Sequence, residues 1–239
     1  MRLRRRELLE SVAFLLIGGT AIGRAQSLPW RPFAGSPPTP IGKEQWVFFD
    51  PAEGAAVEAL VDRLIPPDPD TPGGKDAGCA VYIDRQLAGP YGRRAGLYLS
   101  PPFIKGTKQQ GPQDADGPAV RYRKALAALD QYCKKDKGGA FASLSDADKD
   151  AVIAGLESGA AKLDGVDGQD FFELLLKNAQ EGFFADPIYG GNRDMCSWRM
   201  IGFPGARYDY RDWVNRHNER YPRPPVSIMG RADWNVHKS

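Results

Sequence analysis

Histidine is scarce in this chain: only His217 and His237 occur among 239 residues, and both stand near the C-terminus. Histidine is the commonest metal ligand and the commonest general acid or base at neutral pH. Most histidine-based metal centres and acid–base sites are therefore excluded. The net charge is +2, from 32 Lys and Arg against 30 Asp and Glu, so the chain has no basic field of the kind that binds nucleic acid.

Cysteine is also scarce, and its spacing excludes two kinds of redox chemistry. Cys79, Cys133 and Cys196 form neither a C-x-x-C nor a C-x-x-C-H pattern, so thioredoxin-like chemistry and covalent haem attachment have no support. In an oxidising compartment, an odd number of thiols leaves at least one free or paired with another chain. Cys79 and Cys133 are able to bridge each other. Cys196 is either a small buried apolar side chain or the thiol of an interchain disulfide.

The apolar run near the N-terminus is too short to cross a bilayer core of about 30 Å. Residues 1–25 combine a basic start, the apolar stretch SVAFLLIGGTAIG and small residues before position 26, which is the order of an export signal. Arg5 and Arg6 followed by Leu8 and Leu9 resemble the twin-arginine type. Acidic residues at positions 7 and 10 depart from that pattern, and an ordinary secretory signal is the alternative.

Strand-like alternation is missing, and helical periodicity fills residues 46–184 after a proline-rich linker at 26–45. Asp50, Pro51 and Glu53 predict a capped helix start, and the prolines at 66 and 67 end that helix. Further helices are predicted over 79–89, 118–135, after Ser145 and over 168–184, the last apolar nearly all round and therefore central. The predicted fold class is all-α: a small helical domain with long ordered loops rich in Gly, Pro and aromatics, and an extended C-terminal tail.

The segment 185–239 has no helical period but is rich in aromatic residues, which disordered tails lack. Pro187, Gly190 and Gly191 shape its first loop. Aromatic rings offer rigid contact area and arginines offer planar forks for carboxylates. We therefore predict that this segment wraps around a partner protein. The predicted interface residues are Tyr189, Arg193, Trp198, Arg199, Phe203, Arg207, Tyr208, Tyr210 and Trp213.

Other motifs that resemble binding or catalytic sites are incomplete in this sequence. No nucleotide-binding glycine fingerprint follows a strand, and no phosphate-binding G-x-x-x-x-G-K-[ST] loop occurs. The stretch 68–79 resembles a calcium loop, but Pro72 and Cys79 stand where ligands belong. Asp164, Asp167 and Asp170 are better explained as turn and helix-cap residues. Cys196 has no histidine nearby in sequence to activate it. We predict no catalytic, cofactor-binding or metal-binding residue in this chain.

Several stretches resemble the gluconate 2-dehydrogenase subunit 3 family. They are FFDPAEGAAVEALVDRLIPPD, GCAVYIDRQLAGPYG and FFELLLKNAQEGFFADPIYGGNRDMCSWRMIGFPGARYDYRDWV, together with the twin-arginine start. The resemblance runs in order from about residue 46 to residue 214, and its most specific part is DPIYGGNRD…IGFPGARYDY. The members of this family are small (gamma) subunits of bacterial membrane-associated flavin dehydrogenases.

The resemblance implies a heterotrimer in which this chain carries no cofactor. A large subunit of the glucose–methanol–choline oxidoreductase type holds FAD and oxidises a sugar or polyol, and a multihaem cytochrome c subunit with haem c passes electrons on. The small subunit assists maturation of the flavin subunit and supplies the signal for the twin-arginine translocase. The expected location is the periplasm, at the outer face of the inner membrane. The specificity for one sugar would reside in the large subunit.

Two other functions remain open at the level of sequence. The chain is alternatively a stand-alone periplasmic oxidoreductase whose glycine-rich tail closes over a ligand, in which case the purified chain would show flavin absorbance. The third hypothesis is a cytoplasmic chaperone whose N-terminus is never cleaved. In that case the protein would be found only in the cytosol, with Met1 intact.

Overall fold

The computed structural model describes residues 45–97, 100–104, 106–110, 115–207 and 210–228. The predicted export signal, all but one residue of the linker, and Tyr208 lie outside the described residues. Within them the helices are α2 (Pro51–Leu64), α3 (Cys79–Ala88), α4 (Pro118–Asp136), α5 (Asp146–Glu157), α6 (Gly168–Phe184) and α7 (Cys196–Ile201). Two isolated bridges are the only β pairing found there. The prediction of an all-α fold is confirmed.

The predicted start of the first helix is confirmed at atomic level. The Asp50 side chain accepts a hydrogen bond from the backbone N–H of Glu53, and the Glu53 side chain accepts one from the N–H of Asp50. Pro51 occupies the first helical turn, where its missing N–H costs nothing. Helix α2 ends just before the two prolines at 66 and 67, as the sequence predicts.

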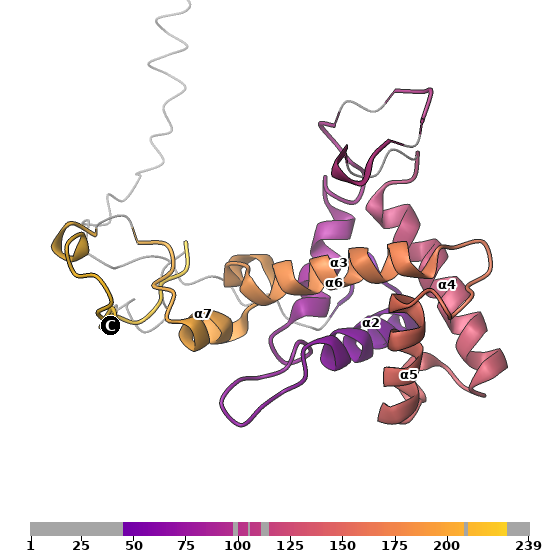
Figure 1. Cartoon of the computed structure of the whole chain (residues 1–239), viewed down its shortest axis with the longest axis horizontal. Coiled ribbons are helices and arrows are strands. Elements are labelled where there is room, and N and C mark those ends of the chain that lie inside the picture. Colours follow the sequence, from indigo (N-terminus) through magenta and orange to yellow (C-terminus); the bar gives the residue numbers. More distant parts are fainter. Residues whose placement is uncertain (1–44, 98–99, 105, 111–114, 208–209, 229–239) are drawn as a thin grey trace, which may run out of the picture.

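Helix α6 lies at the centre of the molecule and contacts α2, α3, α4, α5 and α7. The Asp167 side chain caps it by accepting hydrogen bonds from the N–H groups of Gln169 and Asp170, so the cap prediction for this aspartate is confirmed. Buried residues occur on successive turns along its whole length, among them Phe171, Leu175 and Ala179. Figure 1 shows the other helices arranged around it.

Tyr122 of α4 connects the core through both its ring and its hydroxyl. The ring packs edge-on against Phe171 with centroids 5.6 Å apart. The hydroxyl donates to Oδ1 of Asn178 at 3.1 Å. Complete burial raises the Tyr122 pKa well above its usual value. Because both polar groups are buried, each needs this hydrogen bond to avoid a desolvation penalty.

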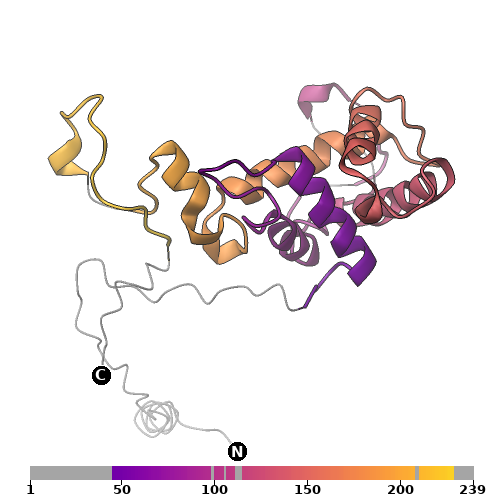
Figure 2. The same ribbon diagram turned by 90° about the horizontal axis from the view of Figure 1, so that it is seen from below.

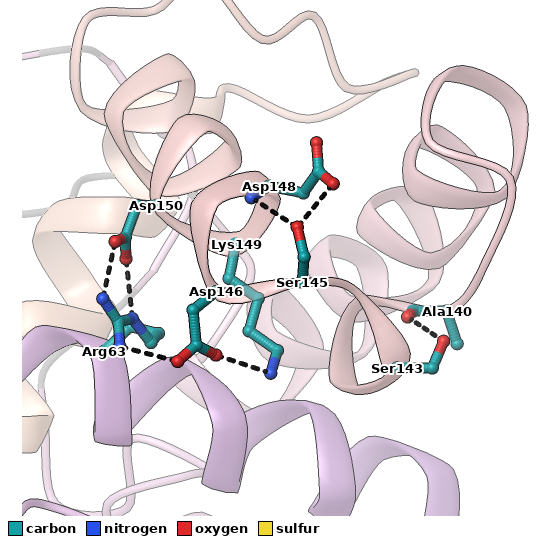
Figure 3. Close-up of polar contacts among 8 residues, drawn as sticks. All are labelled: Arg63, Ala140, Ser143, Ser145, Asp146, Asp148, Lys149 and Asp150. Carbon is teal, nitrogen blue, oxygen red and sulfur yellow. Dashed lines mark hydrogen bonds and ion pairs between the residues drawn. The ribbon is translucent and has the colours of Figure 1, made fainter.

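Charged side chains hold α5 against α2 at the surface. The Arg63 guanidinium donates to both carboxylate oxygens of Asp150 and also reaches Asp146, as Figure 3 shows. Ser145 caps α5 by accepting from the N–H of Asp148. The hydrogen bond from Arg63 lowers the pKa of Asp150. These groups are fully or partly exposed to solvent, so the contacts orient α5 more than they stabilise the fold.

Asp84 of α3 anchors the beginning of the folded domain. Its fully buried carboxylate accepts hydrogen bonds of 2.9 Å from the consecutive N–H groups of Val47, Phe48 and Phe49, and it pairs with Arg85. The segment that follows the linker is therefore fixed to a buried residue of α3.

In the part of the chain that the structure describes, no helix is long and apolar enough to span a membrane.

Candidate functional site

The residues predicted to bind a partner lie at one end of the molecule. Figures 1 and 2 show α7 and the residues after it extending beyond the helical body. The absence of helical periodicity after Phe184 suggested no helix there, yet the structure contains α7 over Cys196–Ile201. A helix of six residues is too short to display a period. We call residues 202–228, whose positions 208 and 209 are not described, the C-terminal arm.

The buried carboxylate of Asp186 ties the end of the C-terminal arm to the helical domain. Asp186 is 8% exposed and accepts hydrogen bonds from the Ser227 hydroxyl at 2.6 Å and from the Ile228 N–H at 2.7 Å. It also accepts from the N–H of Ile188, two residues on. A second contact, an isolated parallel β-bridge, joins Gly205 to Val226. The arm therefore leaves the body and returns to it.

Asn192 organises the loop between α6 and α7. Its side chain is fully buried and its Oδ1 accepts from both the N–H and the hydroxyl of Ser197, while its Nδ2 donates to the carbonyl oxygen of Ala185. Asn192, Asp194 and Met195 all have positive φ angles, of 45°, 54° and 55°. Non-glycine residues with such angles are strained, and they persist only where surrounding contacts hold them.

Two glycines allow this loop to lie directly on α6 and α3. A Cβ added to Gly191 would lie 2.0 Å from the carbonyl oxygen of Gly182 in α6. A Cβ added to Gly78, at the start of α3, would lie 2.5 Å from the carbonyl oxygen of Gly190. The Arg193 N–H completes the contact by donating to the carbonyl oxygen of Ala77 at 3.0 Å. The predicted shaping role of Gly190 and Gly191 thus corresponds to close backbone packing.

A cavity of about 860 Å³ separates this loop from the segment after α2. Asp70 and Asp76 line one side, and Arg193, Arg199 and Cys196 line the other. The Asp68 carboxylate lies in the stretch that resembles a calcium loop. It accepts hydrogen bonds from the N–H groups of Asp70 and Thr71, which stabilise a local turn. Among the described residues, no cluster of three or more His, Cys, Asp and Glu is placed to hold a metal ion.

The three thiols, all in described residues, are unbridged in this chain. Burial raises the pKa of Cys79 to about 12 and that of Cys133 to about 11. Burial also raises the Cys196 pKa, and Cys196 is half-buried. A thiolate is the reactive form of cysteine, and burial disfavours that form at all three positions. Of the two histidines, His217 is exposed on the C-terminal arm, and His237 lies outside the described residues.

Trp198 belongs to the core of this chain. It is 6% exposed, and its indole N–H donates to the carbonyl oxygen of Phe184 at 2.9 Å. The ring packs edge-on against Phe203 with centroids 5.1 Å apart. The indole therefore anchors α7 to the end of α6 and is not presented to solvent, which the sequence did not reveal.

Other predicted interface residues are at least partly exposed. Arg199 is exposed on α7, and Phe203, directly after it, is 44% exposed. Met200 and Ile201, which the sequence analysis did not single out, are 50% and 57% exposed. We call these four residues the α7 edge. They make α7 amphipathic, with Trp198 inside and the α7 edge outside.

Aromatic and arginine side chains support the C-terminal arm from within. Tyr221 stands at the centre: Trp213 and Tyr210 pack against its ring with centroids 5.2 and 5.9 Å away. The Arg207 guanidinium lies 5.3 Å from the same ring and donates to the carbonyl oxygen of Pro224. Part of the surface of Tyr210 and Trp213 is therefore buried inside the arm. Tyr189, by contrast, is 48% exposed before α7.

Comparison with known proteins gives one match. The family model described as gluconate 2-dehydrogenase subunit 3 matches residues 51–205, which is more than half of the chain. The matched range begins at the first residue of α2 and ends at Gly205, so it includes α7 and the α7 edge. No match was found among curated proteins or among solved structures.

Proposed function

The chain belongs to the gluconate 2-dehydrogenase subunit 3 family, and from this premise we propose that it is the non-catalytic small subunit of a periplasmic, membrane-associated sugar or polyol dehydrogenase. Family membership indicates a subunit of a gluconate dehydrogenase complex. In our proposal the chain binds an FAD-bearing large subunit of the glucose–methanol–choline type, aids its maturation and twin-arginine export, and stabilises it. A cytochrome subunit with haem c completes the complex.

The observation that carries this proposal is the α7 edge. Met200, Ile201 and Phe203 expose apolar side chains within four consecutive positions, and the exposed Arg199 directly precedes them in the sequence. Apolar groups surrounded by arginine are characteristic of the energetic centre of a protein–protein interface. Met200, Ile201 and Phe203 remain 50%, 57% and 44% exposed, whereas the neighbouring Trp198 is buried.

The loop that presents the α7 edge is held in place before any partner arrives. Asn192 fixes the turn into α7, Asp186 fixes the return of the C-terminal arm, and Gly191 lies against α6. Association costs less free energy when the binding surface is already ordered. An exposed apolar edge on a loop ordered by these contacts supports a docking role.

The test is co-purification. The chain, tagged at the C-terminus and expressed with its genomic neighbours, is purified from the periplasm and examined by visible spectroscopy and a non-reducing gel. We expect a larger flavoprotein with flavin and cytochrome absorbance. A shift of the complex on reduction would reveal an interchain disulfide, and loss of that shift in Cys196→Ser would assign it to Cys196. Flavin absorbance in this chain alone would favour a stand-alone oxidoreductase and contradict the proposal.

Matched variants locate the interface. Met200→Ser combined with Ile201→Ser removes exposed apolar area from the α7 edge and should reduce recovery of the flavoprotein at least about tenfold. Val120→Ser removes an apolar side chain of similar exposure, 43%, from α4 and should leave recovery unchanged. Full recovery with the α7 variant would place the partner elsewhere.

A further inference from the structure

A second apolar surface lies on the loop between α3 and α4. Leu97 is 64% exposed, Phe103 42% and Ile104 72%, and Pro101 and Pro102 are exposed as well. We call the described residues between 95 and 104 the apolar loop. Single exposed apolar side chains are ordinary, but several in one short segment indicate a surface that binds a protein or a membrane.

The base of this loop is held by backbone contacts. The N–H of Ala119, at the start of α4, donates to the carbonyl oxygen of Gly92 at 3.2 Å. A Cβ on Gly117 would lie 2.7 Å from that same oxygen. Beside them, Nδ2 of Asn178 in α6 donates to the Tyr91 hydroxyl at 3.0 Å. The apolar loop is therefore carried on a fixed base beyond the ends of α3 and α4, as Figure 1 shows.

Cationic side chains predominate in this part of the chain. Residues 89–113 contain four Arg and Lys and no Asp or Glu. Acidic residues follow only at 114 and 116, next to the start of α4, where Asp116 forms an ion pair with Lys124. Arg93 is exposed at the base of the loop. Protein partners pair charges of both signs at the rim of an interface. An anionic lipid surface attracts cations and repels carboxylates, so a segment that binds it lacks acidic residues.

We propose that the apolar loop binds the surface of an anionic lipid bilayer. Phe103, Ile104 and Leu97 enter the boundary between headgroups and acyl chains, and Arg93 lies among the phosphates. Figure 1 shows this loop and the C-terminal arm projecting from different sides of the helical body. Lipid binding is therefore compatible with a protein partner on the α7 edge, and it does not depend on the function proposed above.

Vesicle flotation of the full chain tests the proposal. Wild type is expected to float with vesicles of phosphatidylcholine and phosphatidylglycerol, and to float less with phosphatidylcholine alone or at high salt. Phe103→Ser with Ile104→Ser should lower the partition coefficient about tenfold or more. Arg93→Glu should lower it about fivefold or more on the anionic vesicles only. Because all these side chains are exposed, thermal melts should match wild type.

The matched control is Met200→Ser with Ile201→Ser, which removes similar apolar area from the α7 edge and should float like wild type. Residues 1–44 are identical in every variant, so any binding by the N-terminal apolar run cancels in the comparison. Flotation of the apolar-loop variant at the wild-type level, or equal loss in the control, would overturn the proposal. If the loop variant floats normally but fails to retain the flavoprotein, the loop binds protein instead. Failure of the proposed function would appear separately, in co-purification of the α7 variant.

Discussion

The Ser227 hydroxyl donates a 2.6 Å hydrogen bond to Oδ1 of Asp186, although 41 positions separate the two residues in the chain. Both residues are buried, with 2% of Ser227 and 8% of Asp186 exposed. The contact joins the last described residues of the chain to Asp186, the second residue after α6. It fixes where the C-terminal arm returns, and so which residues remain outside.

Removing this acceptor should free the arm. Asp186→Ala removes the carboxylate that accepts hydrogen bonds from the Ser227 hydroxyl and the Ile228 N–H. Loss of a buried acceptor costs about 1–3 kcal/mol. We expect faster tryptic cleavage at the exposed arginines of the arm that do not precede proline, at 211, 216 and 220. Ser227→Ala removes only one donor and should have a smaller effect. Equal cleavage rates in Asp186→Ala and wild type would show that other contacts hold the arm.

Trp198 should contribute to folding more than to partner binding. Trp198→Ala leaves a cavity beneath α7 and should lower the free energy of unfolding by about 3–5 kcal/mol. Phe203→Ala, at a side chain 44% exposed, should cost much less. Urea unfolding of the isolated chain measures both. If Trp198→Ala leaves stability intact and only abolishes assembly, the indole lies in the interface and not in the core.

Gly191 should be intolerant of any side chain. Gly191→Ala places a methyl group 2.0 Å from the carbonyl oxygen of Gly182, so α6 and the loop must move apart. Overpacking of this kind costs about 1–3 kcal/mol. Gly89→Ala, where the nearest atom is 3.3 Å away, is the matched control and should lower stability clearly less than Gly191→Ala. Similar unfolding midpoints for the two variants would contradict the close approach.

Burial of the thiols predicts that the free energy of unfolding falls at alkaline pH. Cys79 has its pKa raised from 9.0 to about 12 by burial, so the folded state holds its proton more tightly than the unfolded state. The stabilisation is complete below pH 9 and is lost as the pH rises toward 12. Cys79→Ala should flatten this decline when unfolding is followed between pH 8 and pH 11. An unchanged slope would assign the decline to other groups, such as Tyr82, whose pKa is also raised to about 12.

The N-terminal arginine pair predicts the export route. Replacing Arg5 and Arg6 by lysine preserves charge but removes the pattern that the twin-arginine translocase recognises. We expect the dehydrogenase activity of the co-expressed complex to remain in the cytoplasm. Replacing Arg4 alone is the control and should not alter the distribution. Periplasmic activity at the wild-type level in the double variant would indicate an ordinary secretory signal.

Local signals in the sequence determined most of the helical body. The Asp50–Pro51–Glu53 cap and the Asp167 cap act over three residues, and the structure contains both. The apolar residues of 168–184 predicted a central helix, and α6 contacts five other helices. Such features are predictable because the interacting groups are neighbours along the chain, where helix geometry alone brings them together.

The region after Phe184 was decided by tertiary contacts. Nothing in the sequence around Trp198 distinguishes a core indole from an exposed one, because its burial depends on the end of α6. The loop with positive φ angles at Asn192, Asp194 and Met195 is likewise joined to a distant part of the chain, because the Arg193 N–H donates to the carbonyl oxygen of Ala77. The sequence by itself determined that this segment carries aromatics and arginines. Only the packing of the loop on α3 and α6 decided that Trp198 is inside and that Met200, Ile201 and Phe203 remain outside.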